Sequence, residues 1–178
     1  MREELFKNCT LCPRKCNVNR LEGKRGYCGM DSTIRAARAA LHMWEEPCIS
    51  GKKGSGAVFF SGCGMRCCFC QNRDIAIGDF GKEITVERLA EIFLELQEKG
   101  AANLNLVTGA HYVPHIISAL ELARGKGMNL PVVYNSSGYE SVETIRRLDG
   151  YVDVYLPDMK YIEPELAAAF SNARDYPQ

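Results

Sequence analysis

The stretch AVFFSGCGMRCCFC (residues 57–70) contains the most specific pattern in the chain. Residues 57–62 predict a short buried strand, because the run is apolar and ends in serine and glycine. Directly after it, Cys63, Cys67 and Cys70 form a C-x3-C-x2-C pattern. Three thiolates in one loop can hold three irons of a cubane iron–sulfur cluster and leave the fourth iron open to another ligand. An open iron indicates a catalytic site, since a structural metal is normally closed by four protein ligands.

A zinc site is the alternative interpretation of this loop. The zinc ion would be bound by the three thiols together with Cys68 or a distant histidine. Cys67 and Cys68 are neighbours in the chain, and neighbouring side chains point in different directions along an extended backbone. Cys68 is therefore a poor fourth ligand.

Downstream of this loop, short apolar strands alternate with amphipathic helices. The strands are predicted at 103–109 (NLNLVTG), 130–138 (LPVVYNSSG) and 151–160 (YVDVYLPDMK). The helices are predicted at 86–99, 113–126, 141–148 and 164–170, the first with Thr85 as its N-cap. With the strand at 57–62 these segments form four strand–helix units, an order that requires parallel strands joined by right-handed crossovers. The fold class is therefore α/β, either an open doubly wound sheet or part of a barrel.

The front of the chain holds a second group of cysteines. Cys9, Cys12, Cys16 and Cys28 follow the spacing C-x2-C-x3-C-x11-C, which predicts a second metal site that orders a segment with little core of its own. All-cysteine ligation suits both zinc and a second iron–sulfur cluster, and reduced thiols without a metal are the alternative. The glycine-rich run at 50–56 suggests a boundary between a Cys-rich segment, 1–56, and a core, 57–178. Residues 32–44 fit both a helix and an alternating strand.

Composition limits the classes of function. The chain has 178 residues and nine cysteines, and its 22 basic and 22 acidic residues give a net charge of zero. This balance argues against a nucleic-acid binder and against a polybasic membrane-surface protein. No window approaches 18 consecutive apolar residues, and the charged N-terminus shows no secretory signal. A cytoplasmic protein with reduced or metal-bound thiols is expected.

Four stretches together resemble a known family. They are CTLCPRKCNVNR (9–20), HMWEEPCISG (42–51), FFSGCGMRCCFCQN (59–72) and VYLPDMKY (154–161). They resemble the homologues of pyruvate formate-lyase-activating enzyme, a group within the radical S-adenosylmethionine (SAM) superfamily. The resemblance implies a partial (βα) barrel of the radical SAM type, with a [4Fe-4S] cluster on Cys63, Cys67 and Cys70 and SAM chelated to the open iron. It also implies reductive cleavage of SAM to a 5′-deoxyadenosyl radical that abstracts hydrogen from a substrate, an electron donor such as flavodoxin or ferredoxin, and a glycyl-radical protein as a candidate substrate.

The resemblance also assigns SAM-binding residues. Phe69 is expected near the adenine, although simple core packing would also explain it. Asp158 and Lys160 are expected at the SAM carboxylate, with a surface ion pair as the alternative. The polar strand end Asn135, Ser136 and Ser137 is expected at the ribose or the methionine moiety, with turn chemistry before Gly138 as the alternative.

One strand end departs from the family pattern. The usual Gly-Gly-Glu that receives the SAM amino group is replaced by Thr108-Gly109-Ala110-His111. The contact is therefore expected from backbone carbonyls or from Thr108. His111 and Tyr112 are expected to point toward the pocket, which makes His111 a candidate catalytic acid or base, although a lone histidine at a strand end is as often only hydrogen-bonded.

The number of strand–helix units is a further departure. The chain has four of the six βα units of the family's core, so it resembles an N-terminal part with an open sheet edge after its last strand. Two alternatives to an enzyme remain at this point: a non-catalytic iron–sulfur electron carrier and a zinc-dependent binding module. The substrate is not evident from the sequence.

Overall fold

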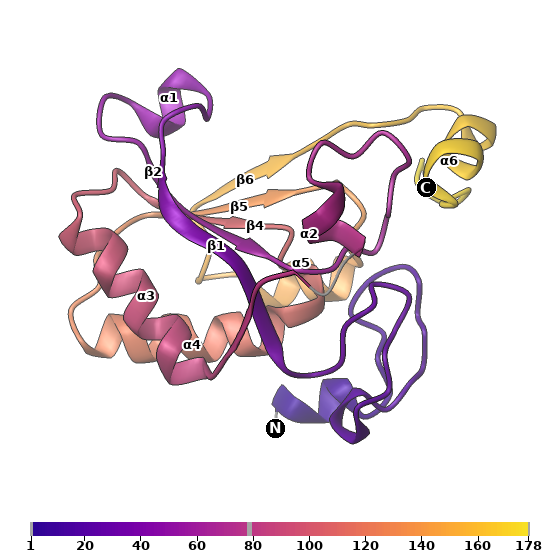
Figure 1. Cartoon of the computed structure of the whole chain (residues 1–178), viewed down its shortest axis with the longest axis horizontal. Helices are drawn as coiled ribbons and strands as arrows, with labels where there is room; N and C mark the ends of the chain where they lie inside the picture. The colour runs from indigo at the N-terminus through magenta and orange to yellow at the C-terminus, as the bar shows by residue number, and fades with distance from the viewer. Residues whose placement is uncertain (1, 78–79, 178) are drawn as a thin grey trace.

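A six-stranded mixed sheet forms the centre of the protein (Figure 1). The computed structural model describes residues 2–77 and 80–177. The strands occur in the order β3-β1-β2-β4-β5-β6. Their bounds are β1 Ile34–His42, β2 Ser55–Phe60, β3 Lys82–Ile84, β4 Leu104–Val107, β5 Val132–Ser136 and β6 Val154–Pro157.

Four of these strands are parallel, as the strand–helix order predicts. β2, β4, β5 and β6 pair in register through Val58, Leu106, Tyr134 and Tyr155. The helices that follow them are α2 Arg73–Ile77, α3 Val86–Glu98, α4 Val113–Gly125, α5 Val142–Arg147 and α6 Pro164–Ser171. The prediction of an α/β fold with a partial βα arrangement is confirmed.

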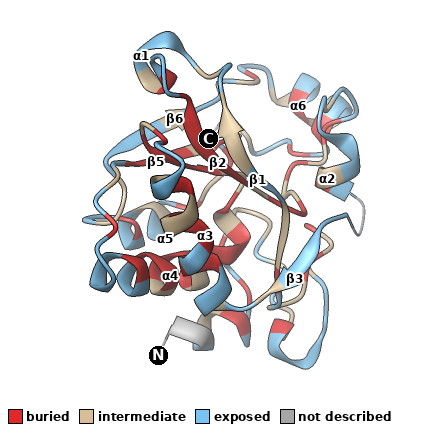
Figure 2. Ribbon diagram, turned by 60° about the vertical axis from the view of Figure 1, so that its left-hand side comes forward, coloured by how far each residue is buried: buried red, intermediate tan, exposed pale blue. Residues whose placement is uncertain are grey.

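Helices α3 and α4 cover one face of the sheet, where they lie side by side (Figure 1). Alternate strand residues point toward them and are fully buried, and they belong to one core with the inner faces of the two helices (Figure 2). The principal members are Val58, Phe60, Leu104, Leu106, Val132, Leu89, Phe93, Ile116 and Leu120. The opposite face of the sheet lines a cavity, so the apolar layer leaves that face available for chemistry.

Helix α3 begins at the predicted cap. The hydroxyl of Thr85 accepts a hydrogen bond from the backbone N–H of Arg88 at 3.2 Å. Ser141 caps α5 in the same way by accepting from the N–H of Thr144. Both caps satisfy a donor that the first turn of a helix leaves unpaired.

The ambiguous segment 32–44 contains a strand. β1 runs antiparallel to β2, from Ala36 opposite Phe60 to His42 opposite Ser55. As a helix, this segment would need to bury a stripe that ends at Trp44, but Trp44 is 88% exposed. Backbone pairing on both sides, with β2 and with β3, outweighs the helix propensity of its alanines.

The sheet also extends into the predicted front segment. β1 belongs to the central sheet although it precedes the suggested boundary at residue 56, and the three-residue β3 was not predicted. Before β1, the described residues contain the short 3-10 helices Arg2–Phe6 and Arg20–Glu22 and a small apolar cluster of Phe6, Cys9 and Leu11.

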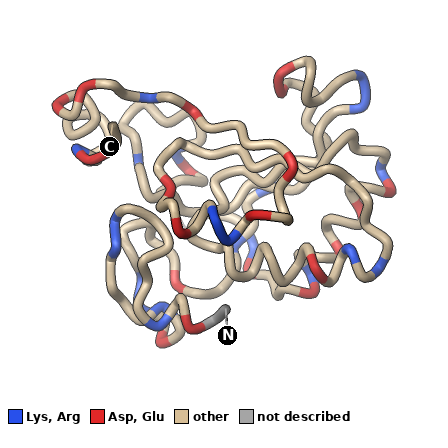
Figure 3. The backbone as a smooth tube through the Cα atoms, turned by 180° about the vertical axis from the view of Figure 1, so that it is seen from behind, with Lys and Arg blue, Asp and Glu red and all other residues tan. Residues whose placement is uncertain are grey.

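Acidic and basic residues are distributed along the described chain without long runs of one charge. Figure 3 shows acidic and basic positions interspersed along the backbone. No helix in the described ranges has the length and apolarity needed to cross a lipid bilayer.

Candidate active site

The loop after β2 brings three cysteines to one cavity. Cys63, Cys67 and Cys70 line a cavity of about 670 Å³ on the uncovered face of the sheet. The loop turns at Gly62, whose φ of 87° and contacts leave no room for a side chain: a Cβ there would lie 2.4 Å from Cγ of Met30. The backbone N–H of Met65 donates to the sulfur of Cys63 at 3.4 Å. Burial raises the pKa of the Cys63 thiol, and the nearby sulfurs of Cys67 and Cys70 raise it further.

The donor chemistry of the three thiols suits an iron–sulfur cubane, in which each thiolate binds a different iron. In the described part of the chain, no three His, Cys, Asp or Glu side chains are arranged to hold one metal ion. All nine cysteines are free thiols in this structure, so none of the triad is consumed in a disulfide.

The polar ends of three parallel strands line the same cavity. Thr108 follows β4, Asn135 and Ser136 end β5, and Asp158 follows β6. The cavity lining also includes Ser137, Lys160 and Phe69. The structure therefore brings together the cysteine triad and all seven side chains that were expected to bind SAM.

Contacts at two of these positions bear on the alternative interpretations. Lys160 forms the ion pair with Asp158 that the alternative named, with 2.6 Å between Nζ and Oδ2. Phe69 is 57% exposed and makes edge contacts with the rings of Tyr161 and Phe170, so it lies at the cavity rim and is not a core residue.

His111 does not face the main cavity, contrary to the expectation. It is 4% exposed, and its Nε2 lies 2.7 Å from the carbonyl oxygen of Ser61. Burial, with help from the positive charge of Arg20, lowers its pKa to about 3, so the ring is neutral. Tyr112 is fully buried in the helical core. Both residues belong to the short helix Ala110–Tyr112 and do not line the main cavity, so this geometry provides no support for His111 as an acid or base.

The four front cysteines lie close to one another and to the cysteine loop that follows β2. Cys9 and Cys28 are buried, and a side chain on Gly26 would lie 3.4 Å from the sulfur of Cys16 and 3.7 Å from that of Cys28. Burial raises the pKa of Cys12 to about 12, and the sulfurs of Cys28, Cys9 and Cys16 add to the shift. Cys12, Cys28 and Cys63 line one small cavity of about 20 Å³. The front group is thus compact and adjoins the cysteine triad.

Sequence comparison agrees with this geometry. A model of the radical SAM superfamily matches residues 57–177. The chain belongs to the radical SAM superfamily. The family implies a [4Fe-4S] cluster and SAM, and the triad and strand ends described above fit that pair of cofactors.

Two relatives give the scale of the similarity. The chain is 35% identical to the uncharacterized protein MJ0674 of Methanocaldococcus jannaschii over 181 residues, which covers 98% of this chain and 52% of that protein. It is 27% identical to the pyruvate formate-lyase-activating enzyme of Clostridium pasteurianum over 113 residues, which covers 61% of this chain and 46% of that enzyme. The chain spans about half the length of the curated relatives it matches.

The structure adds residues to the radical SAM site that sequence reasoning missed. Arg38 and His42 of β1, and Trp44 and Glu45 after it, line the main cavity. The signal for His42, Trp44 and Glu45 was the stretch HMWEEP, which contributed to the family resemblance without a role for its side chains. Tyr176 had no sequence signal, because its contacts join distant segments. Glu140 was also missed, although its hydrogen bond to Ser136 spans only four residues.

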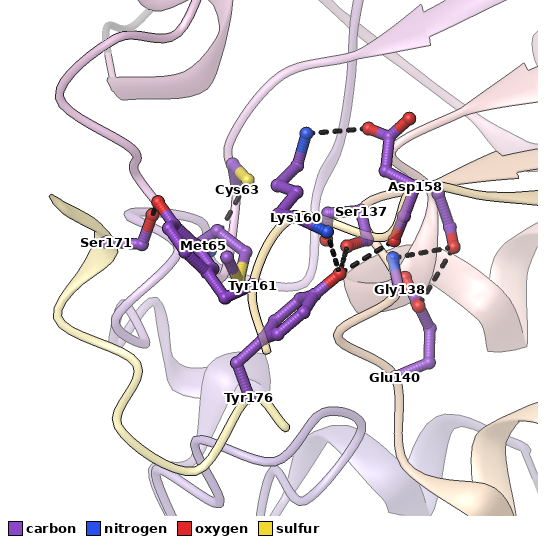
Figure 4. Close-up of polar contacts among 11 residues, drawn as sticks. Cys63, Met65, Ser137, Gly138, Glu140, Asp158, Lys160, Tyr161, Ser171 and Tyr176 are labelled. Carbon is purple, nitrogen blue, oxygen red and sulfur yellow. Dashed lines mark hydrogen bonds and ion pairs between the residues drawn. The ribbon is translucent and has the colours of Figure 1, made fainter. Parts of the chain in front are cut away.

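The hydroxyl of Tyr176 joins two of the strand-end loops (Figure 4). It accepts a hydrogen bond from the backbone N–H of Lys160 at 2.9 Å and lies 2.7 Å from the carbonyl of Asp158 and 2.9 Å from that of Ser137. Gly138 permits this approach: its φ is 73°, and a Cβ would lie 2.4 Å from the Asp158 oxygen. Tyr176 therefore holds the ends of β5 and β6 at a set separation.

We expect Tyr176→Phe to weaken SAM binding by about tenfold, because it leaves backbone groups of both loops without their partner. SAM affinity of the anaerobically reconstituted chain measures this effect. Tyr139→Phe is the matched control, since its hydroxyl donates instead to Asp175 at 2.8 Å. Equal SAM affinities of wild type and Tyr176→Phe would show that the loops are held by other contacts.

Glu140 forms a hydrogen bond to Ser136 at the end of β5. Its Oε2 accepts a hydrogen bond from the hydroxyl of Ser136 at 2.9 Å. Burial raises its pKa from 4.5 to about 7, the Ser136 hydrogen bond opposes this rise, and the charge of Asp158 adds to it. The folded protein therefore favours the protonated acid between these two values.

This shift predicts a pH effect on stability. Between about pH 4.5 and 7 the folded state holds a proton that the unfolded state releases, so the free energy of unfolding falls as pH rises through this window, by at most about 3 kcal/mol. Glu140→Gln is expected to remove this pH-dependent change in the free energy of unfolding and to be more stable than wild type at pH 8. Urea unfolding from pH 5 to 8 measures it, with exposed Glu143→Gln as the control. Parallel pH profiles for wild type and Glu140→Gln would contradict it.

Proposed function

We propose that the chain binds a [4Fe-4S] cluster through Cys63, Cys67 and Cys70 and is the N-terminal part of a radical SAM oxidoreductase. The observation that carries the proposal is the shared cavity, which the three thiols line together with the polar strand ends Thr108, Asn135 and Asp158. A [4Fe-4S] cluster held by these cysteines would supply one electron for cleavage of SAM to methionine and a 5′-deoxyadenosyl radical, which would abstract hydrogen from the substrate.

The protein's own residues bind and orient SAM. The Lys160 ammonium suits the SAM carboxylate, and the paired Asp158 orients that ammonium. Asn135, Ser136 and Ser137 offer hydroxyl and amide groups to the ribose or methionine moiety, and Phe69 offers a ring face at the rim for the adenine. Thr108, with φ of 58°, offers its hydroxyl and nearby carbonyls to the amino group.

A protein substrate is the second part of the proposal. Support comes from the name of the Clostridium pasteurianum relative, which acts as an activating enzyme of another protein. For this chain, the proposed substrate is a glycyl-radical protein, and the proposed electron donor is flavodoxin or ferredoxin. The free thiols of this chain suit the reducing cytoplasm.

The front cysteines are proposed to bind a second metal centre. Their compactness and burial support metal binding. All-cysteine ligation suits both zinc and an iron–sulfur cluster. Cys12→Ser should then lower the total metal content of the anaerobically reconstituted chain, which metal analysis would measure.

One experiment separates this function from the alternatives. The chain is reconstituted anaerobically with iron and sulfide, reduced, and assayed for 5′-deoxyadenosine formed from SAM. Reductive SAM cleavage supports the enzyme. Redox cycling of iron without SAM cleavage, repeated in a version extended to the length of the relatives, would support an electron carrier. Zinc without iron would support a binding module.

A further inference from the structure

Arg14 of the front segment contacts two segments that are distant from it in the sequence. Its Nε donates a hydrogen bond to the carbonyl of Gly64, the residue after Cys63, at 2.8 Å. Its two terminal amino groups donate to the carbonyl of Ser171, at 3.0 Å, and to that of Asn172. One guanidinium therefore joins the cysteine loop after β2 to the C-terminal end of α6.

The end of α6 suits a guanidinium. Ser171 is the last residue of this helix, and Asn172 follows it with a left-handed φ of 47°. The last carbonyls of a helix lack partners within the helix and carry a partial negative charge. The planar guanidinium of Arg14 has five donors, so it can bind two such carbonyls and a third one in the cysteine loop at the same time.

Two aromatic rings hold this guanidinium in place. Its Cζ lies 4.0 Å from the ring centroid of Tyr27 and 5.2 Å from that of Tyr139. Both distances are within the range of a cation–π contact. Tyr139 packs in the small core that also contains Met65 and Cys67 of the cysteine loop. The orientation of Arg14 is therefore fixed by packing as well as by hydrogen bonds.

Arg66 makes the reciprocal contact, from the cysteine loop to the front segment. It lies between Cys63 and Cys67 in the sequence, and its Cζ lies 5.4 Å from the ring centroid of Tyr27. This approach requires Gly29, whose φ is 82° and where a Cβ would lie 2.5 Å from an amino nitrogen of Arg66. The two segments thus contact each other through one arginine from each, and both arginines lie against the same tyrosine.

Helix α6 also contacts the cysteine loop directly. The backbone N–H of Cys68 donates to the carbonyl of Phe170 at 2.8 Å. The hydroxyls of Tyr161 and Ser171 lie 2.6 Å apart in the same region (Figure 4). The front segment, the cysteine loop and the end of α6 therefore form one set of contacts, and Arg14 is bonded to the other two segments at once.

We infer that Arg14 is a positioning residue for the cysteine triad: it fixes the backbone of the loop at Gly64 and holds a positive charge beside Cys63. Gly64 lies between the first two triad cysteines in the sequence, so a bond that fixes its carbonyl also restricts where their sulfurs lie. A positive charge near an iron–sulfur cluster raises its reduction potential, because the reduced state carries one more negative charge. The effect of the charge rests on the proposed function, whereas the effect on the loop does not.

Arg14→Met tests the effect on the loop, because methionine keeps an apolar stem but donates no hydrogen bond. Hydrogen–deuterium exchange is measured by mass spectrometry with single-residue fragmentation, on the reduced chain before reconstitution and on the anaerobically reconstituted chain. The amide of Cys68 should exchange about tenfold faster than in wild type, because the loop loses a bond from a charged donor. The amide of Thr108, which donates to the carbonyl of Asn135 at 3.0 Å in the central sheet, should keep its wild-type rate.

A redox titration of the reconstituted chain, followed by electron paramagnetic resonance, tests the effect of the charge. Arg14→Met should lower the reduction potential of the cluster. Arg14→Lys keeps the charge but not the planar fork of donors, so it should speed exchange at Cys68 while its potential stays closer to that of wild type. Lys15→Met removes the neighbouring charge at an exposed position and should change neither the exchange rates nor the potential.

Three results would overturn the inference: an unchanged exchange rate at Cys68 in Arg14→Met, an equal acceleration at Thr108, which would identify Arg14 as a residue of general stability, or an unchanged reduction potential. If Arg14→Met does not fold, the exchange rates of Arg14→Lys decide. A wild-type chain that binds no cluster would contradict the proposed function, and exchange in the reduced chain would still decide whether Arg14 positions the loop.

Discussion

Replacement of Cys67 by serine is expected to abolish SAM cleavage and to remove about four irons per reconstituted chain relative to wild type. Cys67 is 8% exposed at the cavity wall, and the backbone N–H of Cys70 donates to its carbonyl at 3.2 Å. The loop conformation therefore survives the change, and only the sulfur ligand is lost. Two thiols cannot hold the cubane in a site that must leave one iron open.

The adjacent Cys68 provides a matched control for this experiment. Its side chain is exposed and is not part of the cavity lining, while its backbone N–H donates to the carbonyl of Phe170 at 2.8 Å. Cys68→Ser should keep both the iron and the formation of 5′-deoxyadenosine. Loss of iron in Cys68→Ser, or full activity in Cys67→Ser, would contradict the assignment of the triad.

Replacement of Arg20 by methionine is expected to lower the free energy of unfolding by about 3 kcal/mol. Arg20 is 0% exposed. Its guanidinium donates to the carbonyl of His111 at 2.7 Å, to the carbonyl of Asp31 at 3.1 Å and to the sulfur of Cys9 at 3.7 Å. Methionine fills the space but leaves buried carbonyl oxygens without donors.

Urea unfolding of the reduced chain under anaerobic conditions measures this loss. Arg20→Lys should also destabilise the chain, because one ammonium cannot reproduce the fork of donors that reaches three segments. Arg146→Met, at an exposed position of α5, is the control for loss of a positive charge. A change below about 1 kcal/mol for Arg20→Met would show that these contacts do not hold the front segment to the sheet.

Much of the fold could be predicted because its signals are local. Apolar runs that end in polar residues gave β2, β4, β5 and β6, and Thr85 marked the start of α3. β1 could not be assigned, because its alanines suit helix and strand alike and only the neighbouring strands choose between them. β3 has three residues and no pattern long enough to detect.

The candidate site likewise has features that local sequence predicts and features that only tertiary contacts decide. The spacing of Cys63, Cys67 and Cys70 within one loop, and the polar residues after each parallel strand, are properties of the sequence by itself, because a short loop and a strand end each impose their own geometry. Only the tertiary structure decided that His111 turns away from the cavity, since its direction depends on the carbonyl of Ser61, fifty residues earlier. It alone also placed Tyr176 between two strand ends, because its contacts join segments whose separation along the chain carries no local signal.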